Sequence, residues 1–412
     1  MLKRCSCTIA MVFTVGCVLV GMTATSAWAT PLPGGDEGAA GGATSSDGGS
    51  AEAISEKAVS EKAVSEKAVD DEPRFKLKGR VFVRDTIVQE GWENRLAITS
   101  ARLGANYRDR ARGLRGEVDI ELSEGKAEIR DAYIGVRAGR KVYVQAGRFK
   151  RPISAIAMTS RWDLPVIERG YVNDLALPNE RSGEPDVLPL SGRVIGVSAR
   201  LRDRSLPAKP TLTVGVFRSP VHAQVATSVG FGNREPVGWG QGFPEDLYSR
   251  LQVEPIKGVE VGVSFGWLRQ LEIAGTRDSF RHGYVSGVDL VIDEPFGDGV
   301  PVQAWLEGFV GDSPFHFAPT LEAQGRFMAA RAIVAVRLRL APGLILEPYV
   351  TGQILDASGE LDEDRITQGG GGINVKIAKS WRIQTAVDHA SVDRRFLYDS
   401  STQLLVQLGA VF

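Results

Sequence analysis

Thr402-Gln-Leu-Leu-Val-Gln-Leu-Gly-Ala-Val-Phe412 alternates between the two faces of an extended strand. One face receives Leu404, Val406, Leu408, Ala410 and Phe412, and the other receives Gln403, Gln407 and Gly409. A strand with one apolar face and one polar or small face is typical of the wall of a membrane β-barrel. Because lipid offers no hydrogen-bond partners to the backbone, we expect this strand to close against the first strand of the barrel.

The N-terminus has the features of an export signal. A short basic region and an apolar run over residues 9–22 precede the small-x-small sequence Ala27-Trp28-Ala29. We therefore expect a signal peptide over residues 1–29 and a mature chain that begins at Thr30. All three cysteines lie before residue 18, so the mature chain is expected to lack disulfides. The alternative, a lipoprotein cut before Cys17, would need a better lipobox than Thr14-Val15-Gly16.

Residues 30–73 have a composition that cannot bury a core. Gly, Ala, Ser, Asp and Pro dominate residues 30–50, and Ser-Glu-Lys-Ala-Val then repeats over 55–59, 60–64 and 65–69. A five-residue period produces no single apolar stripe on a helix, so we expect a low-complexity linker. A short oligomerising stalk or a periplasmic contact remains an alternative.

From residue 74 onward the chain alternates with the period of β-strands. No run of 18 apolar residues that could cross a bilayer as a helix follows the signal. We therefore expect residues 74–412 to form an all-β, antiparallel transmembrane barrel. Sixteen candidate strands carry the alternation: residues 74–84, 97–107, 114–122, 130–138, 141–149, 193–202, 209–218, 246–254, 258–269, 283–293, 301–311, 325–340, 344–355, 366–378, 380–391 and 401–412.

The connections between these strands differ in length. Ala138-Gly-Arg140, Pro255-Ile-Lys-Gly258 and Ala341-Pro-Gly343 read as tight turns, whereas residues 219–244 and 356–365 read as longer loops. Residues 151–190 form the longest interruption and include a helix-compatible apolar stretch. A loop of that length is usually functional.

If the apolar side chains of each strand face lipid, the alternate side chains face the barrel interior and place many charges there. The basic candidates for this lining are Lys76, Lys78, Arg80, Arg84, Arg102, Arg331, Arg337 and Arg339. Acidic side chains, among them Glu117, Asp119 and Glu121, oppose them. The basic excess predicts a mild preference for anions. The alternative, that the charges only keep the interior hydrated, stays open.

Three motifs in residues 129–171 carry a family resemblance. They are Ile129-Arg-Asp-Ala-Tyr133, Ala146-Gly-Arg-Phe-Lys-Arg-Pro152 and Val166-Ile-Glu-Arg-Gly-Tyr171. Together they resemble the phosphate-selective porin O and P family, and the early Phe75-Lys-Leu-Lys-Gly-Arg80 strand and the terminal aromatic residue fit the same family.

The resemblance implies a sixteen-stranded homotrimeric channel in the bacterial outer membrane, narrowed by a long loop and passing anions. It makes Arg148, Lys150, Arg151, Arg161 and Arg169 candidates for the constriction or its support. The strand carries Arg148 where the family commonly has Gln, and its cations are mostly Arg, so the sequence departs from the lysine-rich phosphate channels. An alternative role for Glu168 and Arg169 is to pair and pin the loop.

Enzymatic activity is not expected. His389 and Ser391 have a spacing seen in barrel phospholipases, but no Asn follows to orient the imidazole. No pattern indicates a metal site, a cofactor or a nucleic-acid partner. The sequence therefore predicts an outer-membrane porin for small hydrophilic or anionic solutes, with a periplasmic N-terminal extension. The alternative is a plugged structural or adhesive barrel.

Overall fold

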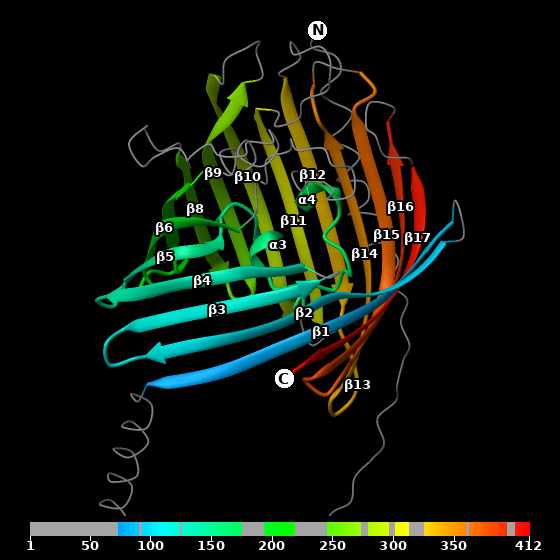
Figure 1. The fold of residues 1–412 in the computed structure, drawn as a ribbon, viewed down its shortest axis with the longest axis horizontal. Coiled ribbons are helices and arrows are strands. Elements are labelled where there is room, and N and C mark those ends of the chain that lie inside the picture. The colour runs from blue at the N-terminus through cyan, green and yellow to red at the C-terminus, as the bar shows by residue number, and fades with distance from the viewer. Residues whose placement is uncertain are drawn as a thin grey trace, which may run out of the picture. The chain divides into compact units, whose positions relative to one another are not determined.

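A computed structural model describes residues 73–89, 93–123, 126–174, 193–218, 245–272, 279–295, 301–312, 325–359, 362–393 and 400–412. The expected signal peptide and residues 30–72 of the expected linker lie outside these residues, as does the whole 219–244 loop. The described chain forms one antiparallel β-sheet and two short helices (Figure 1).

The elements follow the predicted order along the chain. They are β1 (Arg74–Val88), β2 (Glu93–Asp109), β3 (Leu114–Ser123), β4 (Lys126–Ala138), β5 (Val142–Lys150), α3 (Ala155–Met158), α4 (Tyr171–Asp174), β6 (Arg193–Arg202), β7 (Thr211–Arg218), β8 (Glu245–Ile256), β9 (Val259–Glu272), β10 (Ser279–Pro295), β11 (Pro301–Asp312), β12 (Arg326–Val336), β13 (Leu338–Ala341), β14 (Leu344–Asp356), β15 (Arg365–Ile377), β16 (Trp381–Val392) and β17 (Ser401–Val411).

The sheet closes into a barrel because β1 pairs with both β2 and β17. β12 and β13 pair with β14 in one continuous register, so they are two parts of one wall strand and the barrel has sixteen strands. The register places Pro348 of β14 beside the gap between them. Proline has no N–H to donate, which accounts for the interruption. The predicted all-β barrel of sixteen strands is confirmed.

Short turns join the strands at one end of the barrel. Gly139 between β4 and β5 has a φ of 74°, and Gly343 between β13 and β14 has a φ of 80°. This left-handed conformation is accessible to glycine without steric cost and allows a tight reversal. At the other end β5 and β6 are joined by the long loop that begins at Arg151.

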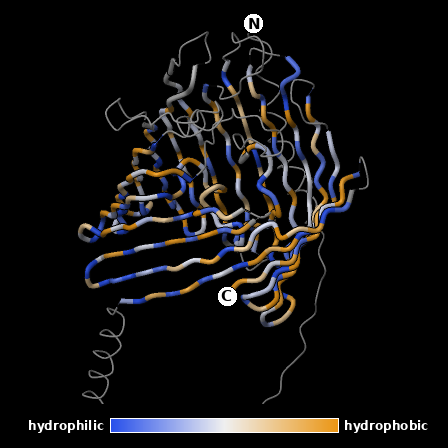
Figure 2. The backbone as a smooth tube through the Cα atoms, viewed as in Figure 1, coloured by the Kyte–Doolittle hydropathy of each residue, from blue (hydrophilic) through white to orange (hydrophobic). Residues whose placement is uncertain are grey.

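The alternation along the strands separates two faces, as the hydropathy colours in Figure 2 show. In β17, Leu404, Val406 and Leu408 are exposed, while Gln407 is buried inside. Leu405 is also buried inside, and the prediction did not assign this apolar residue to the inner face. The inner face is therefore less uniformly charged than the sequence suggested.

Two apolar clusters lie inside the barrel. One gathers mainly inward side chains of β5 to β15 with Ile153 and Val172 of the long loop. The other joins Ile156, Leu164 and Ile167 of the same loop to inward side chains of β11, β12, β14, β16 and β17. The inner apolar residues of the wall are thus explained by a loop that packs against them.

We expect deletion of Phe412 to weaken closure of the barrel. The Phe412 carbonyl accepts from the Gly79 N–H at 2.9 Å, and the Phe412 N–H donates to the Gly79 carbonyl at 3.0 Å. Losing two hydrogen bonds should destabilise the barrel by roughly 1–3 kcal/mol. The measurement is the temperature at which the barrel loses its folded migration on a gel.

The control is Phe75→Ala, which removes another exposed ring from the outer face. Phe75 pairs with Tyr107 of β2 and lies before the residues of β1 that pair with β17. This variant should keep the parent's transition temperature. An equal decrease in both variants would show that Phe412 does not act through closure.

Candidate functional site

The long loop after β5 folds into the barrel and is the main feature of its interior. In Figure 1, β1–β4 cross the near side, β10–β14 form the far side, and α3 and α4 lie between them. α3 contacts β10 and β11, and α4 contacts β12 and β14. The two helices of the loop are therefore attached to the β10–β14 part of the wall. Ser154 caps α3 by accepting from the Ala157 N–H at 2.9 Å.

The first anchor of the loop is Arg151. Its guanidinium donates to Asp246 Oδ2 at 3.1 Å and to the Tyr248 hydroxyl at 2.7 Å, and it lies 5.2 Å from the Tyr248 ring centre. Arg151 is only 1% exposed. The buried ion pair fixes the start of the loop on β8, because removing one partner would leave the other charge unpaired.

The second anchor is the buried pair of Glu307 and Arg331. Arg331 Nη2 lies 2.6 Å from Glu307 Oε2. The carboxylate also accepts from the Ser154 hydroxyl at 2.9 Å and from the Ile156 N–H at 2.7 Å. Arg331 donates to the Arg169 carbonyl at 3.3 Å. One ion pair of β11 and β12 therefore binds the loop at both ends of its inserted part.

The third anchor receives the middle of the loop. Arg382 of β16 donates to the carbonyls of Trp162 at 2.8 Å and of Leu164 at 2.5 Å. Asn374 of β15 donates to the Pro165 carbonyl at 2.8 Å. These side chains supply partners to loop carbonyls that have left water, which removes the cost of burying them.

Apolar contacts reinforce these anchors. Ile153, Ile156, Leu164, Val166 and Ile167 are at most 3% exposed. Burying an aliphatic side chain of this size contributes roughly 1.5–3 kcal/mol relative to leaving it in water. The loop is therefore held on its wall by polar and apolar contacts together.

The opposite wall, formed by β1–β4, carries ion pairs that are partly open to solvent. The Lys78 ammonium lies 2.6 Å from Glu117 and 2.9 Å from Asp119, and the Lys78 side chain is 37% exposed. Arg102 lies 3.0 Å from Glu121. Arg130 also bonds Glu121, with a side chain that is 35% exposed. This wall combines both signs of charge with access to water.

A β-bulge explains how one family-like motif contributes to this wall. The register between β3 and β4 shifts after Asp119, which pairs with Asp131, while Ile120 pairs with Ile129. Arg130 is the extra residue. A bulge of this kind can turn two successive side chains toward one face, and here Arg130 reaches Glu121 while Asp131 accepts from Arg193. Both charges of Arg130-Asp131-Ala-Tyr133 therefore take part in the ion pairs of this wall.

Arg80 has no acidic partner in the described part of the chain. It lies directly opposite Arg102 in the register of β1 and β2. Its guanidinium lies 5.5 Å from the ring centre of Phe82. Like charges directly opposite each other on a sheet repel. Arg102 is paired with Glu121, so Arg80 is the cation of this pair that forms no ion pair of its own among the described residues.

The predicted constriction residues occupy different environments. Lys150 donates to the Ala157 carbonyl at 2.5 Å, and Arg169 donates to the Thr159 carbonyl, so both lie at the end of α3. Arg161 is half-buried in the same loop. Arg151 is the buried anchor described above, and Arg148 lies 2.7 Å from Glu128. The structure thus brings Lys150, at the end of β5, and Arg169 together at the end of α3, and it separates Arg148, Arg151 and Arg161 from them.

The predicted lining residues also divide into groups. Lys78, Arg80 and Arg102 lie on the β1–β2 wall, and Lys76 is exposed near the start of β1. Arg84 of β1 bonds Glu168 of the loop, and this ion pair attaches that part of the loop to β1. Arg331 lies beneath the loop. Arg337 bonds Glu347 at 2.9 Å, and exposed Arg339 lies at the short-turn end.

Several residues of the site carried no signal in the sequence. Asp246 and Tyr248, which hold Arg151, lie more than 90 positions away from it. Asn374 and Gln384 hold the Pro165 carbonyl from positions still farther along the chain. Strand alternation predicted only that these side chains point into the barrel. Their contacts with the loop could not be predicted, because they depend on where the loop docks.

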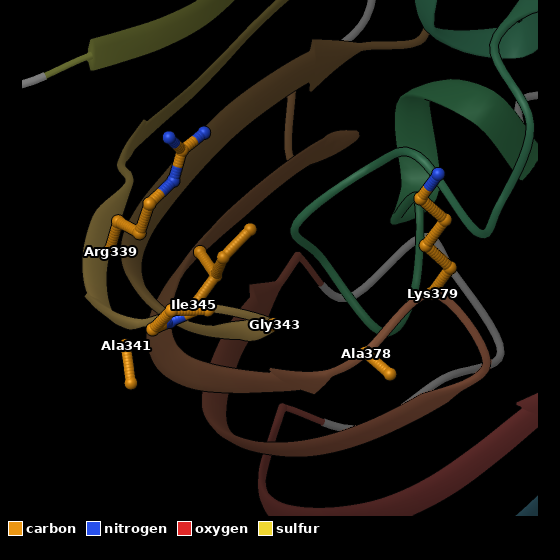
Figure 3. A pocket seen from close by; sticks show the side chains of 7 residues that line it. Arg339, Ala341, Gly343, Ile345, Ala378 and Lys379 are labelled. Atoms are coloured by element: carbon orange, nitrogen blue, oxygen red, sulfur yellow. The ribbon is translucent and has the colours of Figure 1, made fainter.

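Two other features have the composition or the shape of a ligand site. Oxygen atoms of Glu117, Asp119 and Asp131 lie within 4.8 Å of one another. Lys78 and Arg193 already bond these carboxylates, so we assign no metal there. A depression of about 760 Å³ lies at the short turns after β13 and β15 (Figure 3). It is lined by apolar turn residues with Arg339 and Lys379 at its edge, away from the inserted loop.

Comparisons with known proteins agree with this architecture. The model of the family described as phosphate-selective porin O and P matches residues 99–183. No curated protein matches the chain. Among the described residues, no helix has the length and apolar character needed to cross a membrane.

Solved structures with a similar fold come from outer-membrane proteins. The channel DcaP of Acinetobacter baumannii is 11% identical, with a TM-score of 0.54 over 82% of this chain and 97% of that one. OmpT of Vibrio cholerae in its trimer form is 10% identical, with a TM-score of 0.54 over 83% and 100%. OmpF of Salmonella typhi, in complex with daunomycin, is 12% identical, with a TM-score of 0.54 over 83% and 99%.

At these TM-scores and coverages the structures share a fold. The family match contains Arg130-Asp131-Ala-Tyr133, the strand end at residues 146–152 and the loop motif at residues 166–171. The resemblance to the phosphate-selective porin O and P family is therefore confirmed over residues 99–183, and the chain has the barrel fold of outer-membrane porins.

Proposed function

We propose that this protein is an outer-membrane porin through which small hydrophilic solutes diffuse passively, with a preference for anions. The observation that carries the proposal is that the loop inside the closed barrel is anchored mainly on one part of the wall, with a further bond from Arg84 of β1 to Glu168. The loop is anchored on β8, β11, β12, β15 and β16. The charged side chains of the β1–β4 wall keep access to water. Passive diffusion along this wall requires no catalytic residue or cofactor.

The preference for anions rests on cations that lack full compensation. Arg80 forms no ion pair among the described residues, and Lys150 bonds neutral carbonyl groups. Positive charge at a narrow point lowers the barrier for an anion. Ion pairs such as Lys78–Glu117 occupy the same wall, so the preference should be mild. Phosphate-type anions are among the solutes that the channel is proposed to pass.

The location and assembly are part of the proposal. The similar structures are described as outer-membrane proteins, and OmpT as a trimer. We infer the same membrane, in a Gram-negative bacterium, and a homotrimer for this chain. A removed signal peptide and a periplasmic N-terminal extension complete the arrangement.

A plugged barrel is the competing function. The apolar packing of Ile156, Leu164 and Ile167 beneath the loop is the observation in its favour. A plugged barrel would pass no steady current in a planar bilayer even when its migration on a gel shows correct folding. Steady ohmic steps would favour the porin.

We expect Arg80→Gln to reduce the preference for anions. Removing one positive charge that acts at about 4 Å through water changes the energy of a passing anion by about 1 kcal/mol, which corresponds to at most about a fivefold change in the chloride-to-potassium permeability ratio. The measurement is the reversal potential under a KCl gradient, repeated with potassium phosphate.

The matched control is Arg326→Gln, which removes an exposed arginine at the loop end of β12. It should leave the reversal potential unchanged. A parent channel that selects cations, or an Arg80→Gln channel with the parent's reversal potential, would contradict the proposed role of Arg80.

We expect Glu307→Gln to loosen the loop and to increase or destabilise the single-channel current. The substitution removes the charge that holds Arg331 and weakens acceptance from Ser154 and Ile156. Breaking a buried ion pair costs about 3–5 kcal/mol. Single-channel recording measures the conductance and its noise.

Asp289→Asn supplies the control for a general loss of stability. Asp289 forms an equally buried pair with Arg250, at 2.5 Å, between β10 and β8 of the wall. This variant should be destabilised by a similar amount and keep the parent's conductance. A conductance change of the same size in both variants would show that the Glu307 pair does not control the loop.

A further inference from the structure

The short-turn end of the barrel carries a band of cations that the proposed pore does not use. Three successive turns join β2 to β3, β4 to β5 and β6 to β7. We define the basic rim as the cationic side chains of these turns. They are Arg110, Arg112, Arg140, Lys141, Arg204 and Lys209.

The basic rim is continuous because backbone hydrogen bonds connect each turn to the neighbouring hairpin. The Arg137 N–H donates to the Gly113 carbonyl at 2.8 Å, and the Arg202 N–H donates to the Lys141 carbonyl at 2.8 Å. The Glu254 N–H donates to the Ala208 carbonyl at 2.7 Å. The cations are therefore held side by side on a fixed edge of the sheet.

The rim keeps its positive charge and its access to water. Arg112, Lys141 and Lys209 have side chains that are 73%, 54% and 43% exposed, although each bonds one acidic residue. Arg140 and Arg204 are exposed and have no acidic partner in the described ranges. The three acidic residues thus leave the charges of Arg140 and Arg204 without an ion pair in the described ranges.

One acidic residue of the rim has a strongly lowered pKa. Hydrogen bonds from Lys141 and Ser205 lower the pKa of Asp203 to about 2. The Asp203 carboxylate is therefore charged near neutral pH.

An apolar belt adjoins the rim on the outer face of the barrel. Tyr107, Val136 and Leu201 are exposed at the ends of β2, β4 and β6, and Leu206 is 50% exposed in the β6–β7 turn. Each lies within a few residues of a rim cation. At about 3.3 Å per residue in a strand, the apolar and cationic groups are separated by no more than the depth of a lipid headgroup region.

We propose that the basic rim binds the phosphate groups of anionic phospholipids in the leaflet at the short-turn end. In outer-membrane barrels the short turns are periplasmic, so this leaflet is the inner one. A phospholipid fits both parts of the surface, because its acyl chains cover the apolar belt while its headgroup meets the cations. Lys and Arg near an anionic membrane surface attract it electrostatically. A small soluble anion would make no use of the adjoining belt.

The test uses the mature full-length protein in detergent with equimolar dioleoyl phosphatidylglycerol and dioleoyl phosphatidylcholine. Native mass spectrometry measures the lipids that remain bound. The parent should retain phosphatidylglycerol about fivefold over phosphatidylcholine, and Arg110→Gln/Arg140→Gln/Arg204→Gln should lower this ratio below about twofold. Migration on a gel verifies that the triple variant is folded.

The matched control removes three exposed arginines from the opposite end, as Arg95→Gln/Arg326→Gln/Arg365→Gln. It should keep the parent's lipid ratio. The unmodified protein supplies a second measurement, because raising NaCl from about 0.1 to 0.5 M should screen the headgroup interaction and reduce the ratio.

Three results would overturn the proposal. They are equal retention of the two lipids by the parent, an equal loss in the control variant, and a preference insensitive to salt. If the parent shows no lipid preference while the rim variant loses anion selectivity in a planar bilayer, the rim serves permeating anions and the lipid proposal fails.

Discussion

Backbone hydrogen bonding in lipid is the constraint on which this structure depends. An unpaired N–H or C=O in hydrocarbon costs several kcal/mol, so every strand edge in the membrane must be paired. β1 satisfies this requirement by pairing with β2 on one side and β17 on the other. The same requirement makes the interruption at Pro348 tolerable only as a local break in an otherwise continuous register.

A closed barrel of sixteen strands has an interior that is too wide for the side chains of the wall alone to fill. The inserted loop occupies part of that space, and its own carbonyl groups then need partners. Arg382 and Asn374 supply them to Trp162, Leu164 and Pro165. Charged side chains of the wall therefore have two different uses, since some bind the loop and others remain in contact with water.

The sequence predicted the fold well because strand alternation is a local property. The inward or outward position of a residue follows from its neighbours two positions away, so all sixteen wall strands could be assigned. The docking of the loop could not be assigned in this way. Arg151 and Lys150 are adjacent in one basic motif, yet one bonds a buried aspartate of β8 and the other bonds carbonyls at the end of α3. The bulge at Arg130 was similarly invisible, because it depends on the register between two strands.

The location of acidic partners separates cations that fix the loop from cations that can act on a solute. Glu307 and Asp246 are buried beneath the loop and hold Arg331 and Arg151, which are at most 5% exposed. A permeating anion cannot reach those charges. Arg80 lies opposite Arg102 on the other wall and has no acidic partner among the described residues. Because the field of a cation without an ion pair acts over several ångströms of water, we propose that Arg80 acts on a passing anion more than the paired cations do.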